Sequence, residues 1–308
     1  MARRAYVPSG KSDPGALPRL AVAAALAAVL GGLVLGFVSQ WLSLLLIYPA
    51  ALGAVIGGVG VSRVKSRHVR QPLAVALIGL GAGLLGETSL HLVKYARFRS
   101  ELATMLNNNP GAAAYVEANG LDAAVDAALT EESATPPILG YLELAARNGV
   151  TITKAGHSSS SSKPTLTGVG VYALWLINFL IVCGIAVGML VSEARKPFCE
   201  GCVGWYDATH PLAFGAGDSP TVKQAVLRLE GSQYAEAARN LGASDGKSAT
   251  RLTLLGCAKC NAHEPLIELT RITGLKGNKP HEKKVFVSLI SPSEAAQLRA
   301  ATRPAPAS

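Results

Sequence analysis

The chain has 308 residues, of which 49% are apolar and only 16% are charged, and its net charge is +9. Soluble domains carry roughly a quarter charged residues, so this composition does not fit a wholly soluble protein. The apolar residues concentrate in 20–62, 72–93 and 166–191, whereas 192–308 has the mixed polarity of a soluble domain. The sequence therefore predicts a chain that is part membrane-embedded and part globular.

The basic residues flank the apolar segments instead of forming one patch for nucleic acid. Segment 1–19 holds four basic residues and one acid, and segment 63–71 holds four basic residues and no acid. Basic residues beside membrane helices are retained on the cytoplasmic side. The charge therefore indicates orientation, with 1–19 as a cytoplasmic N-terminal segment, and no nucleic-acid partner is expected.

Three apolar segments near the N-terminus have the length of a membrane span. A helix rises 1.5 Å per residue, so a hydrocarbon core of about 30 Å needs about 20 residues. Residues 20–38, 43–61 and 72–93 each fit one span, with a polar turn at 39–41. An alternative interpretation takes 20–38 as a cleaved signal sequence, although its apolar region is longer than usual for one.

Glycines recur four residues apart in each of these spans. The pairs are Gly32/Gly36, Gly53/Gly57 and Gly79/Gly83. Small residues let helix backbones approach closely in lipid, where packing drives association. The pattern predicts close packing of the chain's own helices, and a homo-oligomer formed through these Gly-rich faces is the alternative.

Glu87 and His91 are ionisable residues inside the third span. They are four residues apart and so share one helix face, and such intramembrane residues are candidates for a proton or ion path. The competing interpretation is a structural pair anchored near the interface. Asn178 and Gln40 are the polar residues on other spans that we consider as partners for this possible intramembrane polar site.

Residues 94–164 are nearly neutral and are predicted to form an extracytoplasmic helical loop. Residues 94–106 continue the third helix in an amphipathic pattern, two short helices follow at 121–132 and 136–149, and 151–164 is a flexible Ser-rich linker. Residues 166–191 then form a fourth span. Both termini are consequently expected in the cytoplasm. The Ala-, Gly- and Arg-rich composition suggests a bacterium, so the membrane is expected to be its plasma (inner) membrane.

Four cysteines after the last span form two identical spacings, Cys199-Glu-Gly-Cys202 and Cys257-Ala-Lys-Cys260. Each Cys-x-x-Cys turn places two thiolates on one side of an ion, and two turns complete a tetrahedron of sulfurs. The knuckles resemble those of zinc ribbons and rubredoxins. Residues 203–256 separate them, far more than the roughly 15–20 residues of a simple ribbon, which implies an inserted subdomain.

We predict structural zinc at these four cysteines, because a closed four-sulfur site leaves no open position for catalysis. Three other interpretations stay open: iron in a rubredoxin-like site, which we rank below zinc, a thiol–disulfide redox motif, and two disulfides. The disulfides require the orientation to be reversed, because cytoplasm keeps thiols reduced. Cys183, inside the fourth span, is predicted to be a packing residue.

Residues 192–302 are predicted to form a cytoplasmic metal-binding domain with four cysteine ligands, and 303–308 a disordered tail. The pattern indicates two short helices within 221–242, broken at Gly231–Ser232, and then three antiparallel strands and a last helix. The strands are expected at 249–256, 265–273 and 283–290, and the helix at 291–301 with a Ser291–Glu294 cap.

The fold class expected from the sequence is thus an α-helical membrane bundle of four transmembrane helices with a small α+β, zinc-ribbon-like soluble domain. No nucleophile or paired-carboxylate context points to catalysis. The function expected is a non-catalytic adaptor or assembly protein in the lipid bilayer that docks a cytoplasmic protein partner. The alternatives are a small transporter or ion-coupled protein that uses Glu87 and His91, and a rubredoxin-like electron-transfer protein.

Overall fold

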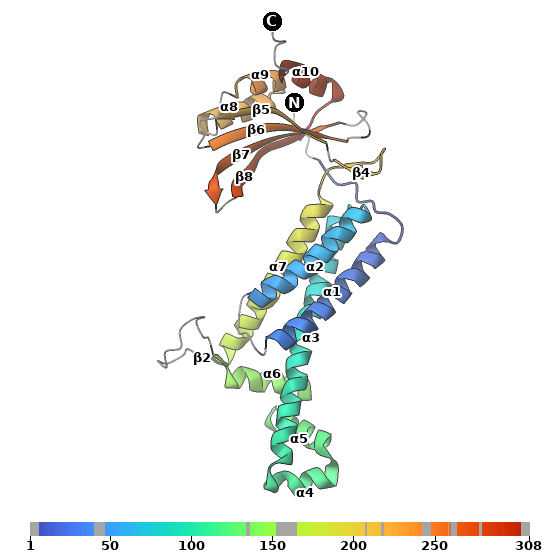
Figure 1. Ribbon diagram of the computed structural model, residues 1–308, viewed down its shortest axis with the longest axis vertical. Coiled ribbons are helices and arrows are strands. Elements are labelled where there is room, and N and C mark those ends of the chain that lie inside the picture. Colours follow the sequence, from blue (N-terminus) through green and yellow to red (C-terminus); the bar gives the residue numbers. More distant parts are fainter. Residues whose placement is uncertain are drawn as a thin grey trace. The chain divides into compact units, whose positions relative to one another are not determined.

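The protein was analysed as a computed structural model. It describes residues 6–39, 47–133, 136–151, 165–206, 208–216, 219–241, 248–257, 259, 264–276 and 279–302. The chain divides into two compact units, and we describe each by itself. One comprises Ser12–Ala194, and the other combines Met1–Lys11 with Arg195–Ser308. The first unit is helical, and the second contains the main sheet (Figure 1).

Among the described residues, four helices are long and apolar enough to cross a membrane. They are α1 (Ala16–Val38), α2 (Ile47–Ser66), α3 (Pro72–Asn107) and α7 (Val169–Ala194). Each one overlaps one of the apolar segments predicted above, so the prediction of four apolar helices is confirmed for this part of the chain. Residues 40–46, including Gln40 and most of the predicted turn, lie outside the described residues.

The glycine pairs lie where these helices touch one another. A Cβ atom built on Gly32 of α1 would lie 2.3 Å from the carbonyl oxygen of Gly86 on α3, and one on Gly83 would lie 2.5 Å from the Cys183 sulfur on α7. The other paired glycines, Gly36, Gly53, Gly57 and Gly79, meet Val93, Val182, Met189 and Val187 respectively. Packing within the chain accounts for all six glycines, and a homo-oligomer stays a prediction.

The third helix continues well past its apolar part, as predicted. Three short helices gather at its far end (Figure 1): α4 (Pro110–Asn119), which the sequence pattern did not predict, α5 (Leu121–Ser133) and α6 (Pro137–Asn148). Tyr95 and Phe98 of α3 pack there with Val125 and Tyr141 in a small apolar core. Burial in this core raises the pKa of the Tyr141 phenol.

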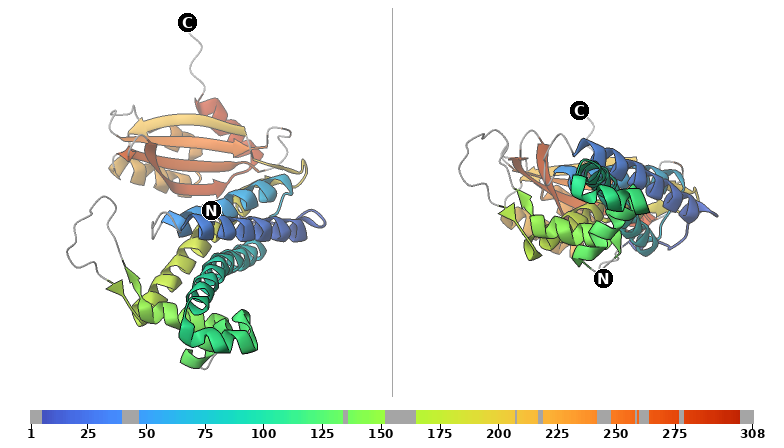
Figure 2. Two further views of the ribbon diagram at one scale, coloured as in Figure 1. Left: turned by 60° about the horizontal axis from the view of Figure 1, so that its bottom comes forward. Right: turned by 90° about the horizontal axis from the view of Figure 1, so that it is seen from below.

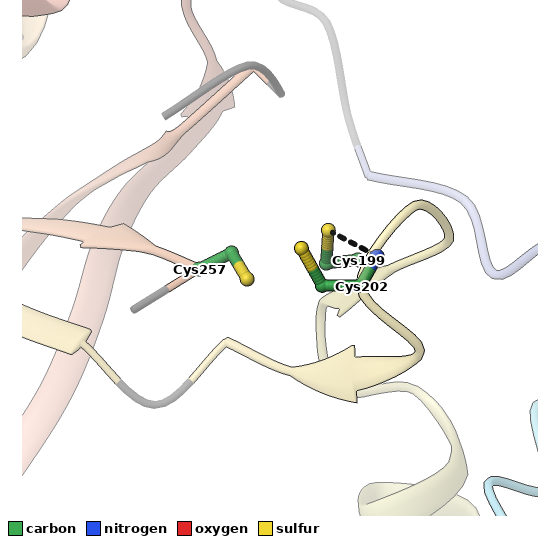
Figure 3. A group of neighbouring side chains, drawn as sticks. All are labelled: Cys199, Cys202 and Cys257. Atoms are coloured by element: carbon green, nitrogen blue, oxygen red, sulfur yellow. Dashed lines mark hydrogen bonds between the residues drawn. The ribbon is translucent and has the colours of Figure 1, made fainter. Parts of the chain in front are cut away.

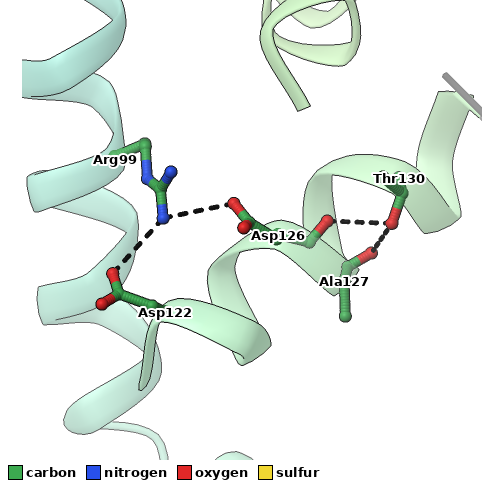
Figure 4. A network of polar contacts seen from close by, with 5 residues as sticks. All are labelled: Arg99, Asp122, Asp126, Ala127 and Thr130. Atoms are coloured by element: carbon green, nitrogen blue, oxygen red, sulfur yellow. Dashed lines mark hydrogen bonds and ion pairs between the residues drawn. The ribbon is translucent and has the colours of Figure 1, made fainter. Parts of the chain in front are cut away.

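An ion-pair network joins α3 to α5 beside this core. The Arg99 guanidinium lies 3.3 Å from an Asp122 carboxylate oxygen and 3.2 Å from one of Asp126 (Figure 4). The guanidinium also lies 5.8 Å from the Tyr95 ring centroid. The paired strands β1 (Val150–Thr151) and β2 (Thr165–Leu166) then lead back to α7. Most of the predicted Ser-rich linker falls outside the described residues.

In the second unit, four described strands form an antiparallel sheet in the order β5 (Ala208–Ala216), β6 (Ser248–Gly256), β7 (Leu266–Lys276) and β8 (Lys279–Leu289). The last three are the predicted strands. The edge strand β5 was not predicted, because Pro211 and Gly215 weaken its strand pattern. A bulge at Pro211/Ala213 accommodates the proline, as is usual on sheet edges.

Helices α8 (Ser219–Glu230), α9 (Tyr234–Arg239) and α10 (Pro292–Thr302) cover one face of this sheet (Figure 1 and Figure 2). The core between the two layers is built from Leu252, Leu254, Ile267, Leu269 and Phe286 of the strands and from small and leucine side chains of the helices. Alternate residues face the other way, as the period of a strand requires. That second face carries an ion pair, in which Lys284 Nζ lies 2.6 Å from a Glu268 carboxylate oxygen.

The helical pair predicted between the two cysteine pairs is present, and it is broken at Gly231–Ser232 as predicted. Serine is a common N-cap residue, but the residue before α9 is Gln233, and no side chain caps that helix. Ser232 instead has a left-handed backbone with φ of 59° and donates its N–H to Leu229 O. The break is therefore made by backbone geometry.

The predicted capping box at the start of α10 is formed. The backbone N–H of Glu294 donates to Ser291 Oγ at 3.2 Å, and that of Ser291 donates to Glu294 Oε2 at 2.7 Å. We expect Ser291→Ala to destabilise the second unit by about 1 kcal/mol, the usual cost of losing an N-cap. Thermal unfolding of the full chain measures this, and Ser293→Ala, which removes a hydroxyl bonded to that of Ser291, should change stability by much less.

Candidate metal centre

The first cysteine pair lies in a short hairpin directly after α7. Strands β3 (Phe198–Cys199) and β4 (Gly204–Trp205) pair antiparallel, and the Phe198 and Trp205 rings meet edge to face at 5.2 Å. In the turn between them, the backbone N–H of Cys202 donates to the Cys199 sulfur at 3.4 Å. This contact holds both thiols on one side of the turn, as the predicted knuckle requires.

The sheet returns the chain to this hairpin for the second pair. Gly256, the last residue of β6, pairs with Ala208, the first residue of β5, and Cys257 follows immediately. The long separation between the cysteine pairs is therefore an excursion through β5, α8, α9 and β6 whose two ends lie side by side. This pairing explains how Cys257 reaches the hairpin that carries Cys199 and Cys202.

The sulfur atoms of Cys199, Cys202 and Cys257 all lie within 4.8 Å of one another, and Figure 3 shows them directed into one space. Cys199 is fully buried and the other two are half-buried, and no disulfide joins these three residues to one another. Zinc–sulfur bonds of 2.3 Å in a tetrahedron place sulfurs roughly 3.8 Å apart, so the three thiols fit one ion. Cys260 lies outside the described residues.

Two tyrosines that the sequence pattern did not single out support the hairpin. The Phe198 N–H donates to the Tyr6 hydroxyl at 3.2 Å, and the Tyr206 hydroxyl donates to the carbonyl of Glu264, just past the second pair, at 3.0 Å. Tyr206 lies close to the first cysteine pair in the sequence, so its place near the site could have been inferred more readily than that of Tyr6. Nothing in the spacing points to Tyr6, which is separated from Phe198 by almost two-thirds of the chain.

An all-thiolate donor set selects soft or borderline metals, chiefly zinc or iron. The described residues thus hold three cysteines in a position to bind a metal, while the identity of that metal and the fourth ligand remain predictions. The backbone N–H bond to Cys199 favours its thiolate, because hydrogen bonding to a charged form stabilises that form.

The other predicted site residues lie on the face of α3 that meets α7. Both Glu87 and His91 are half-buried, and the His91 ring meets the Trp175 ring edge to face, with centroids 5.3 Å apart. Of the two polar partners considered, Asn178 lies on α7 near this contact, and its Oδ1 is buried. The pair is therefore in a helix–helix seam.

No protein-family model matches this chain, and neither a curated protein nor a solved structure is significantly similar to it.

Proposed function

We propose that this chain is an integral membrane protein with a cytoplasmic domain that is stabilised by a structural zinc ion. In this proposal the domain binds a protein partner. The observation that carries the proposal is the convergence of three thiols from two distant segments within 4.8 Å. In this proposal Cys260 supplies the fourth sulfur, and the closed site leaves no position for substrate, so the metal contributes folding free energy and no chemistry.

Two features support our proposal that both termini lie on the cytoplasmic side of a bacterial inner membrane. Four spans return the chain to its starting side, and residues 6–11 belong to the same compact unit as Arg195 and the residues after it. The end of α2 and the loop that leads to α3 are basic, with Arg63 and Lys65 in the last turn of α2 and Arg67 and Arg70 in the loop, which favours retention inside.

A topology experiment checks this orientation. A periplasm-dependent alkaline phosphatase reporter fused after Asn119 is expected to be active, whereas the same reporter after Thr302 is expected to be inactive. A cytoplasm-dependent fluorescent reporter serves as the inverse control at both positions. Activity at Thr302 would place the cysteines outside and revive the disulfide interpretation.

The adaptor role is tested by cross-linking the native protein in intact membranes and identifying what is attached. A partner of the metal domain should be attached to the wild-type chain and to Glu87→Gln, but lost with Cys199→Ser, because only the last variant loses the folded domain. Red colour and iron in the purified protein would instead support the electron-transfer alternative. Loss of the cross-link in Glu87→Gln would contradict docking through the metal domain alone.

A further inference from the structure

The register of α3 against α7 is fixed by two contacts in their seam. A Cβ on Gly83 would lie 2.5 Å from the Cys183 sulfur, and the His91 and Trp175 rings lie 5.3 Å apart. From the first contact to the second, the residue number increases along α3 and decreases along α7, so the two helices are antiparallel. Glu87 is four residues from both Gly83 and His91, and residues four apart share a helix face. Its carboxyl group therefore belongs to this seam.

Asn178 lies on α7 between Trp175 and Cys183, which is the level of Glu87 in this register. Its Oδ1 atom is buried and accepts no hydrogen bond from any described residue, and among the same residues the buried His91 Nδ1 also has no hydrogen-bond partner. A buried polar atom left unsatisfied costs about 1–3 kcal/mol. Two such atoms at the level of one carboxyl group in the same seam indicate that the seam is built to hold something there.

The charge balance of the seam selects the occupant. Glu87 is the only acidic residue in segments 20–38, 47–62, 72–93 and 169–191, so one monovalent cation neutralises it and a divalent metal would leave excess charge in lipid. Alkali cations prefer all-oxygen ligands, whereas an imidazole nitrogen readily takes a proton. A proton is the cation that can interact with all three groups, namely Glu87, His91 and Asn178.

The neighbouring titratable groups leave one route for that proton. Lys94 continues the stripe of α3 toward the end that carries α4–α6, and Cys183 faces the seam from α7. Segment 20–38 of α1 contains no titratable side chain, and the titratable residue in segment 47–62 of α2 is Tyr48, at the beginning of that helix. In the opposite direction along α3, the close Gly83–Cys183 contact fills the seam.

We propose that Glu87 binds an exchangeable proton, which its carboxyl group donates to Asn178 Oδ1. On release, the O–H bond of Glu87 breaks, His91 Nδ1 takes the proton, and Nε2 passes one to water at the α4–α6 end, leaving a carboxylate. Because the seam is filled beyond Gly83, the site loads and unloads from one side and does not conduct. It is independent of the metal centre and of the adaptor role.

Labelling with N,N′-dicyclohexylcarbodiimide, a hydrophobic reagent that attacks protonated carboxyl groups in membranes, tests the site in the full-length protein in lipid vesicles. Mass spectrometry should find Glu87 modified, with a yield that rises as the pH is lowered. Glu87→Gln should lose the label, and Glu101→Gln, which removes an exposed carboxylate paired with Arg97, should leave it unchanged. No label at Glu87, or a yield independent of pH, would overturn the proposal.

Asn178→Leu decides how the amide acts. If its oxygen accepts from the neutral carboxyl, removing it destabilises the protonated form, and the labelling midpoint falls by about half to one pH unit, the worth of one hydrogen bond. If the amide instead donates to a carboxylate as a structural partner, the midpoint rises, and a rise or no shift contradicts our assignment. A helix content equal to that of the wild type, measured by circular dichroism in the vesicles, reports that the helix bundle of the variant is folded.

Discussion

Replacing Cys257 by serine is expected to release the metal and unfold the second unit of the chain. Structural zinc supplies about 10–16 kcal/mol of apparent binding free energy in small zinc-folded peptides, which is as large as the roughly 5–15 kcal/mol by which whole domains are stable. Elemental analysis of the purified full-length protein should show one metal per chain in the wild type and none in the variant. Limited proteolysis should then cut within Arg195–Thr302 in the variant alone.

The fifth cysteine provides the control for this experiment. Cys183 packs against Gly83 in the membrane helices, so Cys183→Ala should keep the metal and the protease resistance of the second unit. Cys260→Ser should behave like Cys257→Ser, which tests the fourth ligand directly. If Cys260→Ser keeps both the metal and the fold, the four-sulfur proposal is wrong, and another group completes the site.

Gly32→Ala is expected to destabilise the helix bundle by about 2 kcal/mol or more. The new Cβ would lie 2.3 Å from the Gly86 carbonyl oxygen, which belongs to backbone and cannot rotate away, so α1 and α3 must separate. Overpacking of this kind typically costs about 1–3 kcal/mol. Unfolding in mixed micelles of increasing sodium dodecyl sulfate content, followed by circular dichroism, measures the difference.

A second glycine separates this clash from the general effect of adding a methyl group. A Cβ on Gly184 of α7 would have nothing within 4 Å, so Gly184→Ala should be neutral or stabilising by up to about 1 kcal/mol through helix propensity. Equal destabilisation by both substitutions would show that the Gly32 contact is not what holds α1 to α3.

The features that the sequence predicts well are those with a strong local period or a fixed spacing. Apolar runs of span length became α1, α2, α3 and α7, and the Ser291–Glu294 pair became a capping box. The approach of Cys257 to Cys199 and Cys202 was likewise expected from tetrahedral geometry, while the fourth ligand stays a prediction. Each of these inferences depends on residues that are near one another in the chain or of identical chemistry.

The features that the sequence did not reveal depend on contacts between distant segments. Strand β5 contains Pro211 and is held in the sheet by pairing with β6 across a bulge. The local sequence pattern of β5 does not indicate that pairing. The Tyr6 contact with Phe198 and the level of Asn178 against Glu87 follow from tertiary packing and register. A single sequence does not show directly which distant segments of the chain contact one another.

The Tyr6–Phe198 contact also has a consequence for biosynthesis. Residues 6–11 are made before the four apolar helices, yet the hairpin that Tyr6 contacts is made after them. The early segment must therefore wait, without its partner, until the whole hydrophobic portion has been inserted. Under the proposed function, metal capture then follows membrane insertion, and a chain whose insertion stalls is expected to lack its ion and to be left open to quality-control proteases.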